Sequence, residues 1–200
     1  MDSALVSDDA YVRDTVRTSV KLLIVGHFAV GKTTLVNTLS EIPPLRTEER
    51  MTQAGALIDD LAGVPEKKTT TVAMDFGRMT LNEQLVLYLF GTPGQRRFTQ
   101  LWHDLSLGAL GALVLTDTRR LEHSFDVMSF LEEQNLQYAV AVNRFDGAPK
   151  YPEEEIREAL DLLPSTPLVT CDARDAASST RALIALVEYL LASRENGSIN

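Results

Sequence analysis

The segment Gly26–Thr33 constrains this chain most, because its residues match the pattern G-x-x-x-x-G-K-[ST]. The apolar run Leu22–Val25 before it predicts a buried parallel strand, and Lys32–Ser40 predicts the following helix. A loop in this context wraps backbone N–H groups around a polyphosphate, and the helix N-terminus adds its dipole. We therefore expect a phosphate site at Gly26, His27, Ala29, Val30, Gly31, Lys32, Thr33 and Thr34.

Two side chains of this loop have expected roles in that site. Lys32 would reach the β- and γ-phosphates and contribute to catalysis, and Thr33 would bind Mg²⁺. The alternative is a glycine-rich turn that arose by chance. The pattern predicts a phosphate ligand but specifies neither the base nor the reaction.

Composition and charge exclude several classes of protein. A length of 200 residues with 44% hydrophobic content suits one compact domain, and a net charge of −9 argues against a nucleic-acid-binding protein. The single cysteine, Cys171, fits a reducing cytoplasm. No apolar run approaches the ~18 residues of a membrane span, and the first residues lack the pattern of a signal peptide. We expect a cytoplasmic protein that only a partner would bring to a membrane.

The order of the remaining elements predicts the fold. Strands are expected at 19–25, 72–81, 84–90, 110–116, 138–142 and 168–170, with helices at 32–40, 98–105, 124–134, 152–163 and 179–193. This alternation predicts an α/β fold with a doubly wound, mostly parallel six-stranded sheet and helices on both faces. The second and third strands are expected to form an antiparallel hairpin, and apolar spacing near 47–61 indicates a helix.

Three segments divide the chain in this prediction. Residues 1–17 are expected to be a flexible arm, 18–193 the folded domain and 194–200 a flexible tail.

A second motif, Asn143-Arg144-Phe145-Asp146, follows the strand expected at 138–142. The Asp146 carboxylate can accept hydrogen bonds from N1–H and the amino group of guanine, and adenine offers no such pair of donors. Arg144 would cover the base with its apolar stem. The alternative for this tetrapeptide is an Asx turn at the end of a strand.

Further along, three segments complete a pattern that resembles the small GTPases. Thr69–Phe76 resembles switch I, which places Thr71, with Thr70 as the neighbouring candidate, where a hydroxyl or the backbone binds Mg²⁺ and contacts the γ-phosphate. Gly91–Gln95 resembles switch II, where Gly94 would donate its N–H to the γ-phosphate and Gln95 would orient the attacking water. Cys171, Asp172 and Ala173 occupy the segment whose backbone contacts guanine O6 in that family, although a polar loop explains them equally well.

This pattern departs from the family at Gly91, where small GTPases usually carry an aspartate associated with Mg²⁺. Asp117 is a possible replacement, but we favour a structural role for it. Arg96 and Arg97 are interpreted as surface residues rather than catalytic ones.

The whole set of motifs resembles a bacterial Ras-like small GTPase of the group encoded in actinobacterial conservons, related to the polarity GTPase MglA. The stretches T-T-V-A-M-D-F-G, F-G-T-P-G-Q and V-N-R-F-D-G carry this resemblance. It implies a P-loop NTPase with a small G domain, GTP or GDP as ligand, Mg²⁺ as cofactor, a roadblock/LC7-type regulator and a sensor-kinase-like partner.

Three functions remain to be compared. The first is a GTP-binding switch that hydrolyses GTP slowly, and the second is a nucleotide-binding scaffold with negligible turnover, which the glycine at position 91 favours. The third is a small-molecule kinase, which would need an arginine-bearing lid and no base-reading aspartate. The segment Asn143–Asp146 counts against the kinase.

Overall fold

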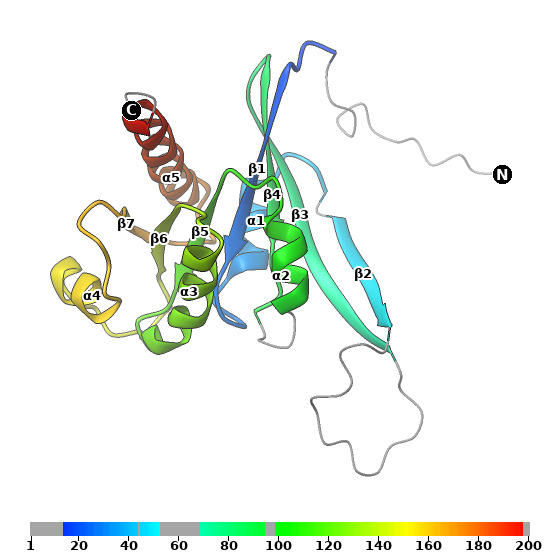
Figure 1. Ribbon diagram of the computed structural model, residues 1–200. Coiled ribbons are helices and arrows are strands. Elements are labelled where there is room, and N and C mark those ends of the chain that lie inside the picture. Colours follow the sequence, from blue (N-terminus) through cyan, green and yellow to red (C-terminus); the bar gives the residue numbers. More distant parts are fainter. Residues whose placement is uncertain (1–13, 44, 53–68, 95–98, 198–200) are drawn as a thin grey trace.

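A seven-stranded sheet forms the centre of the computed structural model, which describes residues 14–43, 45–52, 69–94 and 99–197 (Figure 1). Its strand order is β2-β3-β4-β1-β5-β6-β7. The strands are β1 (Thr18–Val25), β2 (Leu45–Thr52), β3 (Thr69–Asn82), β4 (Leu85–Gly91), β5 (Gly111–Thr116), β6 (Tyr138–Asn143) and β7 (Leu168–Cys171). The five strands from β4 to β7 in this order are parallel, and β3 pairs antiparallel with both β2 and β4.

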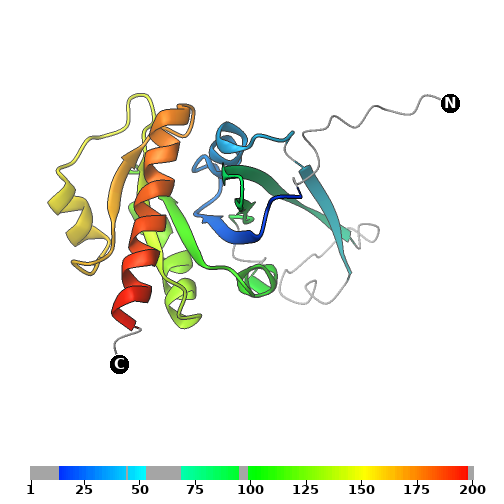
Figure 2. The same cartoon turned by 90° about the horizontal axis from the view of Figure 1, so that it is seen from above.

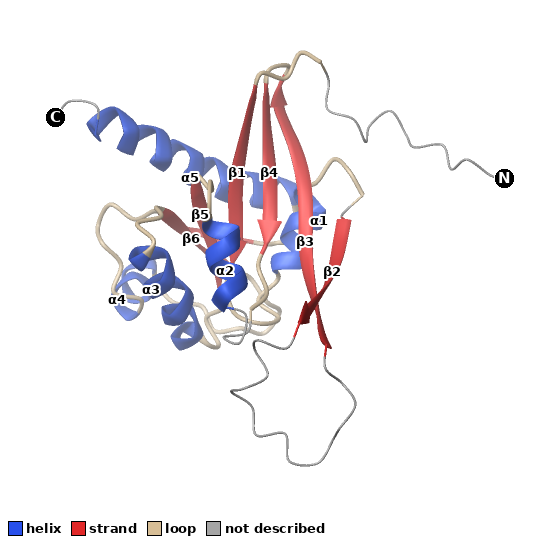
Figure 3. Cartoon of the chain, turned by 45° about the vertical axis from the view of Figure 1, so that its right-hand side comes forward, coloured by secondary structure: helices blue, strands red, loops and turns tan. Residues whose placement is uncertain are grey.

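Helices cover both faces of the sheet (Figures 2 and 3). They are α1 (Lys32–Leu39), α2 (Thr99–Ser106), a short 3₁₀ helix η3 (Leu121–Ser124), α3 (Phe125–Glu133), α4 (Glu153–Ala159) and α5 (Ala176–Gly197). Apolar residues of α1 and α5 pack on one face, and those of α2, α3 and α4 pack on the other. The predicted doubly wound α/β fold is confirmed.

Strand β1 shows why the sequence folds in this way. Leu22 and Ile24 point into the layer of α1 and α5, whereas Leu23 and Val25 point into the opposite layer. All four side chains are at most 2% exposed. A strand that is apolar at every position is stable only where helices cover both faces, as they do here.

Strand β2 lies where the spacing near 47–61 predicted a helix, and it raises the strand count from the expected six to seven. The reason is that the backbone of the neighbouring strand β3 needs hydrogen-bond partners. β3 has 14 residues but β4 has only seven, so the first residues of β3 have no ladder partner on the β4 side. β2 pairs with β3 from Leu45–Phe76 to Thr52–Thr69 and supplies the missing partners. Residues 53–61 lie outside the described part. The predicted hairpin of β3 and β4 is confirmed.

Two helices differ from the expected ranges. α4 ends at Ala159, because Asp161 has a left-handed backbone with φ 51°, and Leu163 beyond it is 68% exposed. α5 continues to Gly197, into the predicted tail at 194–200. Most of the predicted arm at 1–17 lies outside the described residues. In the part of the chain that is described, no helix is long and apolar enough to cross a membrane.

The carboxyl ends of the parallel strands meet along one edge of the sheet. The loops 26–31, 92–94, 117–120 and 144–149 follow β1, β4, β5 and β6 there. Ligands of open α/β sheets bind at this edge. The topology therefore gathers the sequence motifs from both halves of the chain.

We predict that Leu35→Ala lowers the free energy of unfolding by about 2–5 kcal/mol. Leu35 of α1 is fully buried in the layer that α1 shares with α5, so truncation leaves a cavity there. The matched control is Leu163→Ala, which removes the same atoms from an exposed site and should change stability by at most about 0.5 kcal/mol. Urea denaturation followed by circular dichroism measures both. Equal losses would contradict the assignment of the core.

Candidate functional site

The loop between β1 and α1 has the shape of a cradle for an anion. Ala29 has φ 65° and Gly31 has φ 104°, so the chain turns twice through the left-handed region. A Cβ on Gly31 would lie 2.5 Å from Nδ2 of Asn143, so only glycine fits beside that side chain. No side chain caps α1, and the N–H groups of its first turn have no acceptor within the helix. These donors lie at exposed Thr33 and Thr34.

Lys32 is folded back over this loop. Its ammonium donates to the carbonyl oxygens of Gly26 at 2.8 Å and His27 at 2.7 Å, and the residue is only 8% exposed. Burial lowers the pKa of Lys32 to about 8, although the nearby Asp75 carboxylate opposes that shift. The positive charge is thus held in a poorly hydrated place, where an anion stabilises it strongly.

Asp75 is a site residue that sequence reasoning missed. The Thr33 hydroxyl donates to Oδ2 of Asp75 at 2.5 Å, and Asp75 is 9% exposed. In the hairpin ladder Asp75 stands directly opposite Gly91. A Cβ on Gly91 would lie 3.0 Å from Cβ of Asp75. The carboxylate that is missing at Gly91 is therefore present on the neighbouring strand. No pattern in the sequence indicated this pair, because the ladder of β3 and β4 shifts its register between Thr80 and Asn82.

The turn 91–94 lies directly against the loop of β1. A Cβ on Gly94 would come within 2.5 Å of the His27 carbonyl carbon and 2.7 Å of the Lys32 ammonium, so only glycine fits. The indole N–H of Trp102 in α2 donates to the Pro93 carbonyl at 2.8 Å and holds the turn. Gly94 thus lies beside the predicted phosphate site. The expected catalytic residue Gln95 lies outside the described residues.

His27 lines a cavity of about 440 Å³ that Gly26, Gly94 and residues of η3 and α3 also line. Its Nδ1–H donates to the carbonyl oxygen of Phe28 at 2.7 Å, and its ring lies 5.5 Å from that of His123. Nε2 is buried without a hydrogen-bond partner among the described residues. Burial, as the main cause, lowers the pKa of His27. The structure therefore places the His27 side chain in this cavity, next to Gly26 and Gly94 of the predicted phosphate site.

Asn143 connects three loops of the site. Its side chain is almost completely buried, at 5% exposure. Nδ2 donates to the Val30 carbonyl at 2.9 Å, and Oδ1 accepts from the Ala173 N–H at 3.0 Å. Asn143 thereby fixes the phosphate loop relative to the ends of β6 and β7.

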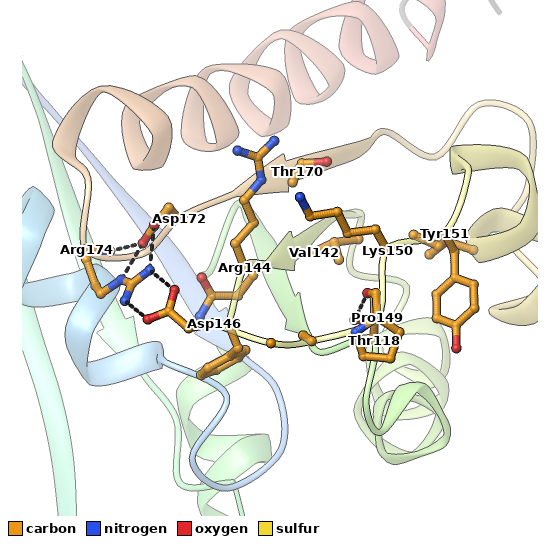
Figure 4. A pocket seen from close by; sticks show the side chains of 15 residues that line it. Thr118, Val142, Arg144, Asp146, Pro149, Lys150, Tyr151, Thr170, Asp172 and Arg174 are labelled. Carbon is orange, nitrogen blue, oxygen red and sulfur yellow. Dashed lines mark hydrogen bonds and ion pairs between the residues drawn. The ribbon is translucent and has the colours of Figure 1, made fainter.

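A cavity of about 620 Å³ lies beyond Asn143 (Figure 4). Arg144, Asp146, Lys150, Asp172 and Arg174 are among the charged side chains that line it. Arg144 is exposed, and its backbone N–H donates to the carbonyl of Cys171 at 2.7 Å. The cavity holds the residues expected to bind the base and adjoins the phosphate loop through Asn143.

The segment after β7 differs from its expected role. The backbone N–H groups of Asp172, Ala173 and Arg174 already donate to the Ser178 hydroxyl, to Asn143 and to the Asp172 carboxylate. The Cys171 side chain is fully buried, with Sγ 3.9 Å from the Ser179 hydroxyl, and burial raises the pKa of its thiol. Cys171 is therefore a packing residue, and the N–H groups expected to contact the base have partners within the protein.

Asp117 has the structural role that the sequence favoured. Its buried carboxylate accepts hydrogen bonds from the side chain and the backbone of Arg119. Burial alone would raise the pKa of Asp117, but these bonds outweigh burial and lower it. The guanidinium of Arg119 in turn stacks 4.1 Å from the centre of the Phe145 ring. Asp117 thus supports the loop that carries Asp146.

Thr71 is not brought to the phosphate loop. It lies in β3, opposite Arg50 of β2. Asp75, which reaches Thr33, is four positions further along the same strand, which corresponds to about 13 Å. The predicted contact of Thr71 with Mg²⁺ would require this end of β3 to move.

Comparison with known proteins agrees with this geometry. A family model described as a conserved hypothetical ATP binding protein matches residues 24–193, and the chain belongs to this family. An uncharacterized protein of Methanocaldococcus jannaschii is 30% identical over 130 residues, which cover 64% of this chain and 71% of that protein.

Solved structures identify the fold. The G domain of the FeoB iron transporter of T. maritima has a TM-score of 0.60 at 21% identity, with 86% of this chain and 99% of that domain covered. The apo cytosolic domain of the same transporter has a TM-score of 0.61 at 20% identity, with 86% of this chain and 64% of that chain covered. The protein is thus a nucleotide-binding P-loop protein with the fold of a G domain.

We predict that nucleotide binding takes up a proton at a pH just above 8. The pKa of Lys32 is about 8, and a bound phosphate raises it because the anion stabilises the ammonium. Affinity should therefore be constant below this pKa and should fall as the pH rises through it. Calorimetry in buffers with different ionisation enthalpies measures the uptake. In the variant Lys32→Arg the side chain keeps its positive charge at all these pH values, so the proton uptake should disappear. Equal uptake by both proteins would exclude Lys32 as its source.

Proposed function

We propose that the protein is a GTP-binding switch that hydrolyses GTP slowly. The observation that carries this proposal is the position of Asn143, which bridges Val30 of the phosphate loop and Ala173 after β7. This bridge sets the loop that bears Asp146 beside the phosphate cradle. A nucleotide with its phosphates in the cradle would have its base in the cavity that Asp146 lines.

The choice of guanine depends on the chemistry of Asp146. Its side chain is 90% exposed and Asp146 is one of the residues that line the cavity, so a pair of adjacent donors on a base could reach its carboxylate. Guanine presents such a pair in N1–H and its amino group, whereas adenine presents an acceptor at N1. The family description names ATP. The site residues favour guanine over the base that this description implies.

The residues around Thr33 fit a magnesium ion. A hydroxyl and a buried carboxylate are hard oxygen ligands of the kind that Mg²⁺ prefers, and Mg²⁺ binds through few protein groups together with substrate phosphates. Among the described residues no group of three His, Cys, Asp or Glu side chains could hold a metal, which agrees with an ion that binds with the nucleotide. Thr33 would hold the ion, and Asp75 would orient that hydroxyl or a bound water. The ion would neutralise phosphate charge.

The protein would contribute to hydrolysis mainly by positioning and electrostatics. The Lys32 ammonium and the N–H groups of the loop would stabilise negative charge that develops on the phosphates. Gly94 would donate its N–H to the γ-phosphate and Gln95 would orient water, as the sequence predicts. The scaffold alternative depended on the missing carboxylate at Gly91, and Asp75 supplies a carboxylate at that place. This observation favours the switch.

The resemblance to conservon-type GTPases supports a proposal about regulation. A roadblock/LC7-type protein would act on the switch in the cytoplasm, together with a sensor-kinase-like protein. Recruitment to a membrane would require a partner.

We predict that the wild-type protein binds GTP and GDP at least tenfold more tightly than ATP, and that Asp146→Asn reverses the preference between guanine and xanthine nucleotides. The amide of asparagine donates to the extra carbonyl of xanthine and repels a donor of guanine. Isothermal titration calorimetry with GTP, ATP and XTP measures these affinities.

The matched control for this experiment is Asp161→Asn. It makes the same chemical change at an exposed position with φ 51°, which asparagine tolerates, and it should leave all three affinities unchanged. Equal binding of ATP and GTP by the wild type would exclude the guanine proposal. An unchanged preference in Asp146→Asn would remove Asp146 from base recognition.

We predict that Asp75→Asn lowers the affinity for Mg²⁺ in the presence of GTP by about 10–100-fold. This is the usual effect of losing a group that orients a metal ligand. Titration with MgCl₂ at fixed GTP measures this effect, and single-turnover phosphate release measures the reaction. The double variant Asp75→Gly/Gly91→Asp moves the carboxylate across the ladder and should restore part of the loss. Gly91→Asp alone should not improve on the wild type, because its carboxylate would crowd Asp75.

Two outcomes would overturn parts of this account. If Asp75→Asn leaves the MgCl₂ titration unchanged, Asp75 does not support the ion. If the wild type binds GTP but releases no phosphate even with its cognate regulator present, the protein is a scaffold.

A further inference from the structure

Arg174, which follows β7, holds two carboxylates at once (Figure 4). Its Nε and Nη2 donate to the two oxygens of Asp172, both at 2.9 Å. Its Nη1 and Nη2 also donate to the two oxygens of Asp146, at 3.2 Å and 3.4 Å. The sequence reading assigned no role to Arg174. Its contacts involve the carboxylate on which the proposed base recognition depends.

We propose that the Arg174 guanidinium competes with guanine for the Asp146 carboxylate. When the base binds Asp146, Arg174 stays paired with Asp172. This inference rests on the proposed guanine-binding function. It adds a group within the chain that sets how tightly the base is bound and how readily it leaves.

The competition follows from the geometry of the donors. A guanidinium presents parallel N–H groups that match the two oxygens of a carboxylate. Guanine presents N1–H and one amino N–H in a similar parallel arrangement. Arg174 contacts both oxygens of Asp146, so the base cannot form its own pair of bonds without displacing these contacts.

The contacts of Arg174 are unequal, and this inequality gives the direction of the exchange. The bonds to Asp172 are shorter than those to Asp146, and the Arg174 backbone N–H adds a third bond to Asp172 at 3.0 Å. These bonds are the main reason that the pKa of Asp172 is lowered to about 2. Arg174 can therefore release Asp146 and still keep its charge paired with Asp172.

The exposure of these side chains indicates that the pair with Asp146 contributes little to the fold. Asp146 is 90% exposed and Arg174 is 56% exposed, whereas Asp172 is 27% exposed. Ion pairs between such exposed groups have small effects on stability. Removal of Arg174 should therefore change nucleotide binding while leaving the fold intact.

The test uses the full chain and a ribose-labelled fluorescent GDP in stopped-flow binding experiments. Arg174→Gln should bind GDP about two- to fivefold more tightly than the wild type, as expected for loss of a weak exposed competitor. Asp172→Asn should bind more weakly, because Arg174 then has only Asp146 as a charged partner. The double variant should match Arg174→Gln, because Asp172 acts only through Arg174. High salt should shrink the difference between Arg174→Gln and the wild type.

Arg181→Gln is the matched control. It removes the same charge from an exposed position on α5, outside the residues that line the cavity, and should bind GDP as the wild type does. Thermal denaturation of each variant checks that the fold is retained. If Asp172→Asn fails to fold, Arg174→Lys replaces it. Lysine lacks the paired donors, so its affinity for GDP should lie between those of the wild type and Arg174→Gln.

The outcomes separate this inference from the proposed function. If the wild type does not bind GDP, both are wrong. If the wild type binds GDP and Arg174→Gln binds it more weakly, Arg174 is a contact of the base and the competition is excluded. If Arg174→Gln and the wild type bind equally, the ion pair has no part in binding, and the guanine-binding function still stands.

Discussion

The buried amide of Asn143 is the interaction on which the rest of the site depends. One side chain satisfies a carbonyl of the phosphate loop and an N–H after β7, so three loops from distant parts of the chain share one geometry. An unpaired amide or carbonyl at this depth would be costly, which gives the arrangement little freedom. Only glycine fits at position 31, because the amide of Asn143 occupies the space that a Cβ would need. The phosphate loop and the cavity lined by Asp146 therefore share one geometry.

Much of the fold was predictable because it depends on local patterns. Apolar runs identified the parallel strands, and the motifs at Gly26–Thr33 and Asn143–Asp146 were located at strand ends, as the structure has them. β2 was not predicted, because its strand conformation depends on the long unpaired portion of β3 rather than on its own spacing.

The site was predictable only where its chemistry is contiguous in sequence. Asp75 and Arg174 act through partners 42 and 28 residues away, at Thr33 and Asp146, and no local pattern shows such pairs. The first pair forms because the fold places β3 beside the start of α1, and the reach of an arginine side chain across two loops creates the second. At Cys171 the side chain is buried, so any contact of this position with a base would involve its backbone alone.

The position of Asp75 has a mechanical consequence. With an aspartate at position 91, the carboxylate near the metal and the turn that approaches the phosphate would be parts of one peptide segment. Here the carboxylate belongs to the middle of β3, which is paired with β4 on one side and continues for seven residues to Asn82. The turn 91–94 can then shift by rotation about its own backbone while the acidic group stays anchored in the sheet. If the proposed function is correct, contact with the phosphate and support of the ion would be separate tasks, performed by two strands.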